Sequence, residues 1–450
     1  MNRSNAQDMT VGPLGRQILL FSLPLIATNL LQVLFNLADV AVVGQFAGTL
    51  ALGSVGSDTT LVSLFTGVLI GIGGGINVLT ARYAGARDAD GEAETVHTAL
   101  LLSLLIGLAL TAAGEWSLRG VLTLLGTRED LMDGAVLYMR IYLLGVPALA
   151  LYNFGSAVHA AVGDTRHPLL YLSLAGALNI ALNLFFVIAL RLSVAGVALA
   201  SVLSQLLSAV LILRSLARRA DAAGLRLSRL RLHKKRAREV LALGIPSGVQ
   251  NAIFACANLV TMSGVNTFST VMVSGNAAAA NADNLVYDVM IAFYTACGSF
   301  MGQNYGARKP ERVRRSYRVS VAWAFGAAAV MGGLLVLFGE GFLALFTNDP
   351  LVIGAGMKRL RIMAPSYCLS AFMDCSIAAS RALGSTLVPT VLVLLGSCVF
   401  RVTWVFTVFA YFRTIPSLYL LYACSFTLTG VMETAYYLRV ARKKLNRLAD

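Results

Sequence analysis

Sequence landmarks in the first half of this chain recur about 222 residues later in its second half. At an offset of 222, Pro24, Asn29 and Asn36 match Pro246, Asn251 and Asn258, and at 221, Gly85, Arg140 and Pro168 match Gly306, Arg361 and Pro389. A nearly constant offset carried through a whole chain indicates two related halves. Among membrane proteins, this arrangement is typical of transporters that alternate access by moving one half against the other.

The composition predicts that the chain lies in a membrane. Hydrophobic residues make up 57% and charged residues only 13%, against about 25% charged in ordinary soluble domains. Apolar runs long enough to cross about 30 Å of hydrocarbon fall near 17–38, 61–80, 97–116, 135–161, 168–190, 194–213, 240–264, 285–304, 319–338, 352–380, 387–411 and 417–438. These runs lack the alternation of barrel strands. We therefore expect an all-α membrane protein with 12 transmembrane helices in two pseudo-symmetric six-helix lobes.

The net charge of +14 is concentrated in three segments. Ten of the 36 Lys and Arg residues lie between Arg214 and Arg238, six lie in 308–318 and five in 439–447. Because cytoplasmic loops carry the excess of basic residues, both termini and the central loop are predicted to be cytoplasmic. The expected lobes are 1–213 and 240–450, joined by a basic linker at 214–239. A membrane surface explains this charge better than nucleic acid does.

Enzymatic and metal motifs are missing from the sequence. The six cysteines form no metal-binding pair, the four histidines lack zinc-ligand spacing, and there is no phosphate-binding loop. We expect no cleavable signal peptide before the first apolar run. We expect no enzyme activity, no metal and no cofactor beyond a coupling ion, and we expect the chain to function as a monomer.

Polar residues inside the apolar runs are the candidates for function. Asn29, Gln32, Asn36 and Asp39 follow a spacing of i, i+3, i+7 and i+10, which places them within about 80° of one helix face. Such a face can hold a dehydrated cation or a proton, although the amides could simply join helices, and Asp39 could lie at the outer interface. Asn179 and Asn183 form a second amide face on the fifth run, which Ser201 of the sixth run could join.

The second half repeats this polar stripe without its acid. Asn251 and Asn258 recur, but Thr261 stands in the place of Asp39. Asp374 lies near the middle of the tenth run and Arg401 midway along the eleventh. They could form a structural ion pair, or Asp374 could bind substrate or a proton. Other acids, including Asp58 and Glu433, lie nearer the run ends, where we expect them to be solvated.

Several motifs in this chain resemble those of one transporter family. They are Asn29-Leu30-Leu31-Gln32, Phe35-Asn36-Leu37-Ala38-Asp39, Gly163-Asp164-Thr165-Arg166-His167-Pro168, Gly196-Val197-Ala198-Leu199-Ala200-Ser201 and Gly302-Gln303-Asn304-Tyr305-Gly306-Ala307-Arg308. Together they resemble the multidrug and toxic compound extrusion (MATE) family over almost the entire chain. The resemblance implies two six-helix lobes around a cavity, and export of organic, often cationic compounds in exchange for H⁺ or Na⁺. It also implies a cation site at Asp39, Asn179 and Ser201.

The chain departs from the family pattern at two places. Asn183 stands where many prokaryotic relatives carry an acid, and the seventh run has no acid at 253–256. Coupling is therefore expected to depend on Asp39, and the choice between H⁺ and Na⁺ stays open. The sequence predicts a multidrug or metabolite exporter of the cytoplasmic membrane. A lipid-linked oligosaccharide flippase, with Arg401 and Arg140 as its cationic candidates, is the second transport function, and a membrane enzyme or a non-transporting sensor would be of another class.

Overall fold

The computed structural model describes residues 7–449, and the side chains of all of these except residues 255, 256, 259 and 449. Within this part of the chain the structure is helical and contains no strand. The helices of the first half are α1 (Leu14–Phe46), α2 (Thr49–Ala86), α3 (Ala89–Leu124), α4 (Glu129–Ala161), α5 (Arg166–Leu184), η1 (Phe185–Ala189) and α6 (Ser193–Ala217). The predicted all-α fold is confirmed.

The second half repeats this series after the short turn η2 (Leu227–Arg229). Its helices are α7 (Lys234–Val265), α8 (Thr270–Gly306), α9 (Pro310–Leu343), α10 (Pro350–Ala382), α11 (Leu387–Val393), η3 (Leu394–Val399), α12 (Phe400–Trp404), η4 (Val405–Phe409), α13 (Ala410–Phe412) and α14 (Ile415–Ala449). The segments from α11 to α13 follow one another without a break and form one rod over 387–412. The element η1 likewise continues α5. Each half therefore supplies six long rods.

Each of the twelve predicted apolar runs lies on one of these rods, which are mostly longer than the runs. Among the described residues, eleven helices are long and apolar enough to cross a membrane. The segment α7 is not counted among them, because the side chains of residues 255, 256 and 259 lie outside the described part of the chain. The remaining helices extend past the apolar runs at polar ends such as that of α3, where the Asp88 side chain caps the first turn.

The chain folds into two compact units whose boundaries differ from the predicted lobes. The first unit contains Ala27–Gly248 and the residues up to Asp8, and the second contains Met9–Ile26 and Val249–Asp450. Two helices, α1 and α7, therefore each belong to both units. In each of these helices, the boundary between the units lies two residues after an internal proline, which is Pro24 in α1 and Pro246 in α7. The two transitions keep the 222-residue offset of the sequence repeat.

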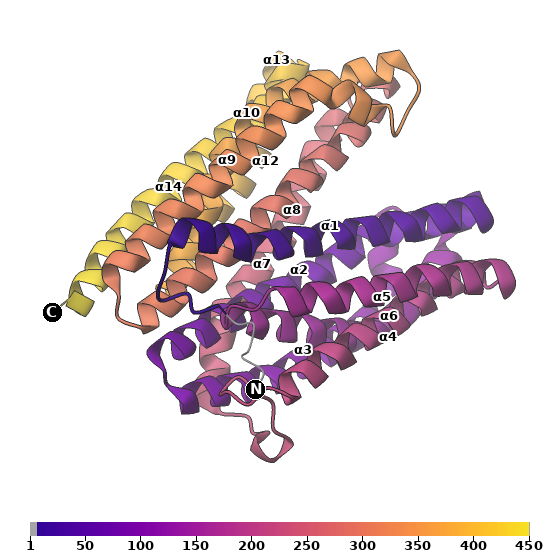
Figure 1. Ribbon diagram of the computed structural model, residues 1–450. Helices are drawn as coiled ribbons and strands as arrows, with labels where there is room; N and C mark the ends of the chain where they lie inside the picture. The colour runs from indigo at the N-terminus through magenta and orange to yellow at the C-terminus, as the bar shows by residue number, and fades with distance from the viewer. Residues whose placement is uncertain (1–6, 450) are drawn as a thin grey trace. The chain divides into compact units, whose positions relative to one another are not determined.

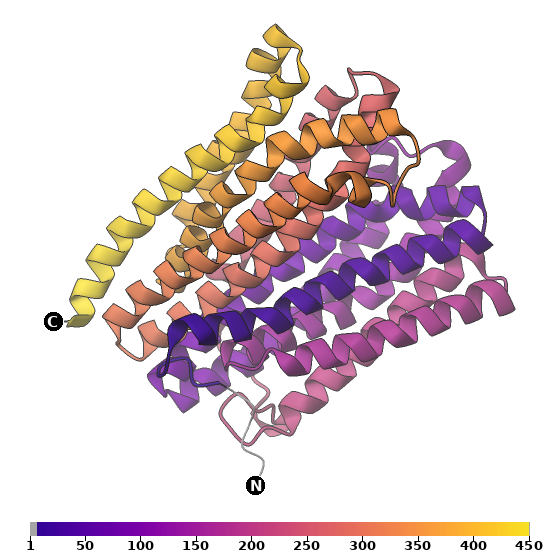
Figure 2. The same cartoon turned by 45° about the horizontal axis from the view of Figure 1, so that its top comes forward.

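Each unit is built around one central helix. In the first unit, α4 packs against α2, α3 and α6, and in the second, α10 packs against α8, α9 and α14. Figures 1 and 2 show α8, α9, α10 and α14 running side by side in the second unit. The repeat in the sequence is thus a repeat in helix packing.

Backbone contacts explain why the start of α1 belongs to the second unit. Arg312 of α9 donates hydrogen bonds to the carbonyl oxygens of Met9, Val11 and Gly12. Asn304 of α8 also donates to the Met9 carbonyl, at 3.1 Å. These bonds hold the segment before α1 on the ends of α8 and α9.

Close packing inside the first unit depends on glycine. A Cβ atom on Gly75 of α2 would lie 2.8 Å from the backbone nitrogen of Gly244, and one on Gly71 would overlap the backbone of Gly248. These glycines therefore let α2 and the first part of α7 approach at backbone distance. Gly74 has nothing within 4 Å of such an atom and faces open space.

Candidate functional site

Asp39 of α1 lies in the interior of the first unit, where side chains from α5 and α6 converge on its carboxylate. The side chain is 9% exposed. Asn183 donates a short hydrogen bond to Oδ1, and Ser201 donates to Oδ2 at 3.2 Å. Asn183 also donates to Asn179 Oδ1 at 3.1 Å, and Asn179 donates to Ser201 Oγ at 3.5 Å. The four side chains form one closed network.

The helical periodicity of α5 produces half of this network. Asn179 and Asn183 are four residues apart, so both side chains lie on one face of the helix. The structure brings Asp39, Asn179 and Ser201 together as predicted. It also gives Asn183 a role that the sequence did not suggest, since this residue donates directly to the Asp39 carboxylate.

The charge of the Asp39 carboxylate is available to bind a cation or a proton. Its hydrogen-bond donors are uncharged, and Asp39 takes part in none of the ion pairs among the described residues. Among the described residues, the buried Asn183 Oδ1 atom has no hydrogen-bond donor. Carboxylate, amide and hydroxyl oxygens gathered at one point can bind a hard cation, and the carboxylate can instead take up a proton.

The remaining residues of the predicted stripe lie outside this network. Asn29 and Gln32 are half-buried, and Asn36 is exposed. In the second unit, Asn251 is half-buried and Asn258 is exposed. Their expected role in function stays a prediction.

The predicted ion pair between Asp374 and Arg401 is wrong. Arg401 donates instead to Ser425 Oγ at 3.1 Å and to Asn258 Oδ1 at 3.2 Å. Its guanidinium therefore lies between α7 and α14, whereas Asp374 is on α10. Asp374 is half-buried and interacts electrostatically with Arg381.

Two buried acids were missed by the sequence reasoning. Asp58 of α2 and Glu433 of α14 are both 0% exposed, and their carboxyl oxygens have no hydrogen-bond partner in the described part of the chain. Both lie well inside their helices, so the expectation that they are solvated at helix ends is wrong. Asp58 belongs to the same unit as Asp39, and Tyr138 interacts electrostatically with both carboxyls.

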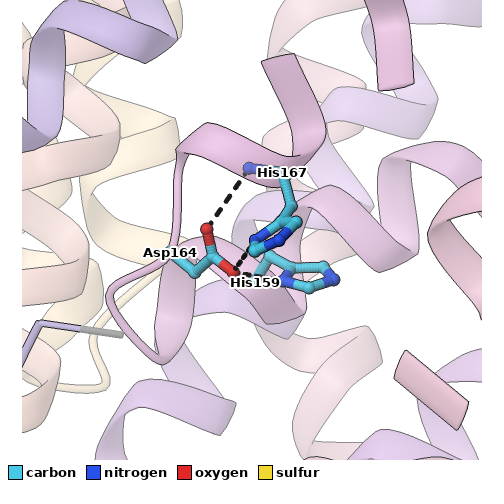
Figure 3. Close-up of side chains that lie close together, drawn as sticks. All are labelled: His159, Asp164 and His167. Carbon is cyan, nitrogen blue, oxygen red and sulfur yellow. Dashed lines mark hydrogen bonds and ion pairs between the residues drawn. The ribbon is translucent and has the colours of Figure 1, made fainter. Parts of the chain in front are cut away.

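A second polar cluster, formed by His159, Asp164 and His167, joins the end of α4 to the start of α5 (Figure 3). Asp164 Oδ2 accepts hydrogen bonds from His167 Nδ1 at 2.6 Å and His159 Nδ1 at 3.2 Å. Arg219 lies 3.8 Å from the same oxygen. One potential metal ligand from each member of the cluster lies within 4.8 Å of the others. Burial alone would raise the pKa of Asp164, but hydrogen bonds and charge from His159 and His167 hold it below its usual value.

We expect this cluster to stabilise the turn between α4 and α5, and Asp164→Asn tests that role. Losing the charged acceptor should lower the free energy of unfolding by about 1–3 kcal/mol. A depressed pKa stabilises the fold above the ordinary carboxyl pKa, and this contribution is lost as pH falls through the folded-state value. Thermal unfolding in detergent should therefore show a difference between the two proteins at pH 7 that shrinks in acid. Asp133→Asn, at an exposed site on α4, is the control, and equal effects of both changes would contradict the assignment.

The fold and the buried carboxylate site together define a membrane transporter built from two repeated helical units. A family model described as MatE matches residues 24–185 and 246–407, so the chain belongs to this family of multidrug and toxic compound extrusion transporters. The two matched segments begin and end 222 residues apart, as the sequence repeat predicts.

Individual relatives cover most of the chain. It is 28% identical to the probable multidrug resistance protein YpnP of Bacillus subtilis over 80% of this chain and 81% of that protein. It is 26% identical to an FAD transporter of Shewanella oneidensis over 76% of each chain. An outward-facing multidrug resistance MATE transporter of known structure has the same fold, with a TM-score of 0.90, 22% identity and full coverage of both chains.

Proposed function

We propose that this protein is a secondary antiporter that exports organic compounds across the cytoplasmic membrane in exchange for H⁺ or Na⁺. The observation that carries the proposal is the Asp39 site, a buried carboxylate inside a membrane-spanning helix that is held by uncharged donors alone. A charge in such a place is costly unless it binds something. Relatives named as multidrug resistance proteins support a broad range of organic substrates.

The proposed mechanism is linkage between two ligands. A cation or proton at Asp39 stabilises one conformation, and the exported compound stabilises another, so that entry of one ligand favours release of the other. The side chains around Asp39 favour this role because they are already oriented toward its oxygens. Their oxygen atoms can complete the coordination of Na⁺, and their donors can stabilise the carboxylate after a proton has left.

The basic segments support an orientation with both termini and the 214–239 loop in the cytoplasm. Transport out of the cell then runs toward the face that carries fewer basic residues. We propose that the chain acts as a monomer, because all the side chains that contact Asp39 come from one unit of this chain.

Export of a single metabolite is the second candidate function. The relative named as an FAD transporter supports it, as does the buried Arg401 of the second unit. The flippase alternative has less support, because Arg140, one of its two cationic candidates, is exposed and lies 3.6 Å from Glu115. It would need several buried cations for a pyrophosphate group.

A flux assay in proteoliposomes tests the proposal. Ethidium uptake or release should follow an imposed pH gradient, an imposed Na⁺ gradient or both, and should stop when the gradient is collapsed by an ionophore. Transport that proceeds equally with and without each gradient would reject the antiport mechanism.

A further inference from the structure

Three arginines are buried in the second unit, and they differ in how their charge is balanced. Arg359 forms an ion pair with Asp283. Arg381 interacts electrostatically with Asp374 and Glu433. Arg401, which is 2% exposed, has no acidic partner in the part of the chain that the structure describes. Its charge is therefore the one in this group that nearby acids leave uncompensated.

Aromatic rings and two polar side chains surround the Arg401 guanidinium. Its central carbon lies 4.7 Å from the ring centre of Tyr422 and 5.2 Å from those of Phe254 and Phe426. Ser425 accepts a hydrogen bond from Nε, and Asn258 accepts one from Nη1. The rings favour a cation, so they offset part of the cost of holding a charge in this place.

Arg401 Nη2 is buried and has no hydrogen-bond partner among the described residues. An unsatisfied buried donor on a charged group lowers stability unless a ligand completes it. The planar fork of arginine matches the two oxygens of a carboxylate or a phosphate. The Nη2 group, together with the neighbouring Nη1 group, therefore has the geometry of a binding site for such an anion.

Asn258 gives this binding site a way to the surface. The residue is exposed on α7, and its side-chain oxygen accepts a hydrogen bond from the neighbouring Nη1 atom of Arg401. An anion that displaced this oxygen could accept from Nη1 and Nη2 together. The Asn258 amide would then be free to donate to the same ligand.

The repeat places this binding site where the first unit has the Asp39 site. Arg401 follows Asn179 by 222 residues and Asn258 follows Asn36 by the same number. In the first unit a carboxylate on α1 accepts from α5 and α6. In the second, a guanidinium on the rod 387–412 donates to α7 and α14. The three corresponding rods of each unit thus meet at one polar site, and the two sites have opposite charge.

We propose that Arg401 and Asn258 bind an anionic group, a carboxylate or phosphate, of the transported compound. This inference rests on the proposed transport function and adds to its substrates organic anions and zwitterions, a set to which cations such as ethidium do not belong. The first unit supplies the negative site for the coupling cation, and the second supplies a positive site for the cargo. An anionic lipid headgroup has the same chemistry and is the alternative source of the bound group.

A matched pair of dyes tests the proposal in the purified full-length protein. Rhodamine 110 carries a free carboxylate, and rhodamine 123 is its methyl ester, so the two differ in the anionic group alone. Fluorescence anisotropy in detergent should show that Arg401→Gln weakens rhodamine 110 binding by about tenfold or more, the effect of losing a charge-assisted hydrogen bond. Rhodamine 123 binding should change by less than about twofold. Equal weakening of both dyes, or unchanged rhodamine 110 binding, would overturn the inference.

Two further variants separate charge from folding. Arg401→Lys keeps the charge without the fork, so it should lose part of the rhodamine 110 affinity and none of the rhodamine 123 affinity, and it carries the test if Arg401→Gln does not give a monodisperse protein. Arg413→Gln, at an exposed arginine just after the same rod, should bind both dyes normally. Any selective loss of rhodamine 110 in Arg413→Gln would count against the Arg401 site.

The source of the anionic group and the transport function are tested separately. In nanodiscs, phosphatidylglycerol that displaces rhodamine 110 from the wild type but leaves rhodamine 123 bound would identify a lipid headgroup as the occupant, whereas no displacement would identify the solute. If gradients drive rhodamine flux but binding does not depend on Arg401, the anion site fails alone. If binding depends on Arg401 but no gradient drives flux, the proposed transport function fails and the anion site stands.

Discussion

Asp39→Asn is expected to abolish gradient-driven export while leaving the protein folded in the membrane. Asparagine has almost the same shape as aspartate, and its oxygen can still accept from Asn183 or Ser201. It cannot take up a proton, and it offers a cation no negative charge. Losing a charged ligand of this kind costs about 1.5–3 kcal/mol of binding free energy, which corresponds to roughly 10- to 100-fold in affinity. Ethidium flux in proteoliposomes should fall to the level of empty vesicles.

Asp133→Asn is the matched control for this experiment. It removes the same carboxylate charge in the same unit, but at an exposed site on α4 outside the network that holds Asp39. We expect normal flux and an unchanged dependence on the gradient. Size-exclusion profiles of both variants should match the wild type. If Asp39→Asn transports at the normal rate, with the normal ion dependence, the coupling role belongs elsewhere and the buried carboxyl of Asp58 becomes the next residue to test.

The fold could be predicted because its main determinants are local in the sequence. A run of about 20 apolar residues can cross a bilayer only as a helix, and a constant offset requires two similar units. What the sequence did not show is that α1 and α7 each belong to both units. That division depends on long-range contacts, such as those of Arg312 with the backbone of Met9, which no local pattern predicts.

The candidate site could be predicted only in part, for a similar reason. Helical spacing placed Asn179 and Asn183 on one face, and the family resemblance joined Asn179 to Asp39 and Ser201. Spacing does not say which neighbouring helix a face meets, so it led to the wrong partner for Arg401. Asp58 and Glu433 were assigned to helix ends because an acid marks the edge of an apolar run, although the helix itself continues through it.

The orientation in the membrane is expected to give an all-or-none labelling result. Ser228 lies in the basic 214–239 segment, and Asn348 lies in the connection between α9 and α10; both are exposed. In a cysteine-free protein in intact cells, Ser228→Cys should resist an impermeant maleimide, because the positive-inside rule places its loop in the cytoplasm. Asn348→Cys should react, because its short connection is expected at the outer face. After the membrane is permeabilised, both should be labelled.

The cysteine-free protein needs all six native cysteines replaced. Cys297, Cys375 and Cys398 are buried, and Cys368 and Cys424 are partly buried. Cys256 is replaced with them, although its side chain lies outside the described residues. Replacement by Ala or Ser keeps the volume change small. Labelling of Ser228→Cys in intact cells, together with protection of Asn348→Cys, would reverse the orientation. The basic segments would then lie outside, and a conformational cycle assigned to export would instead bring its substrate into the cell.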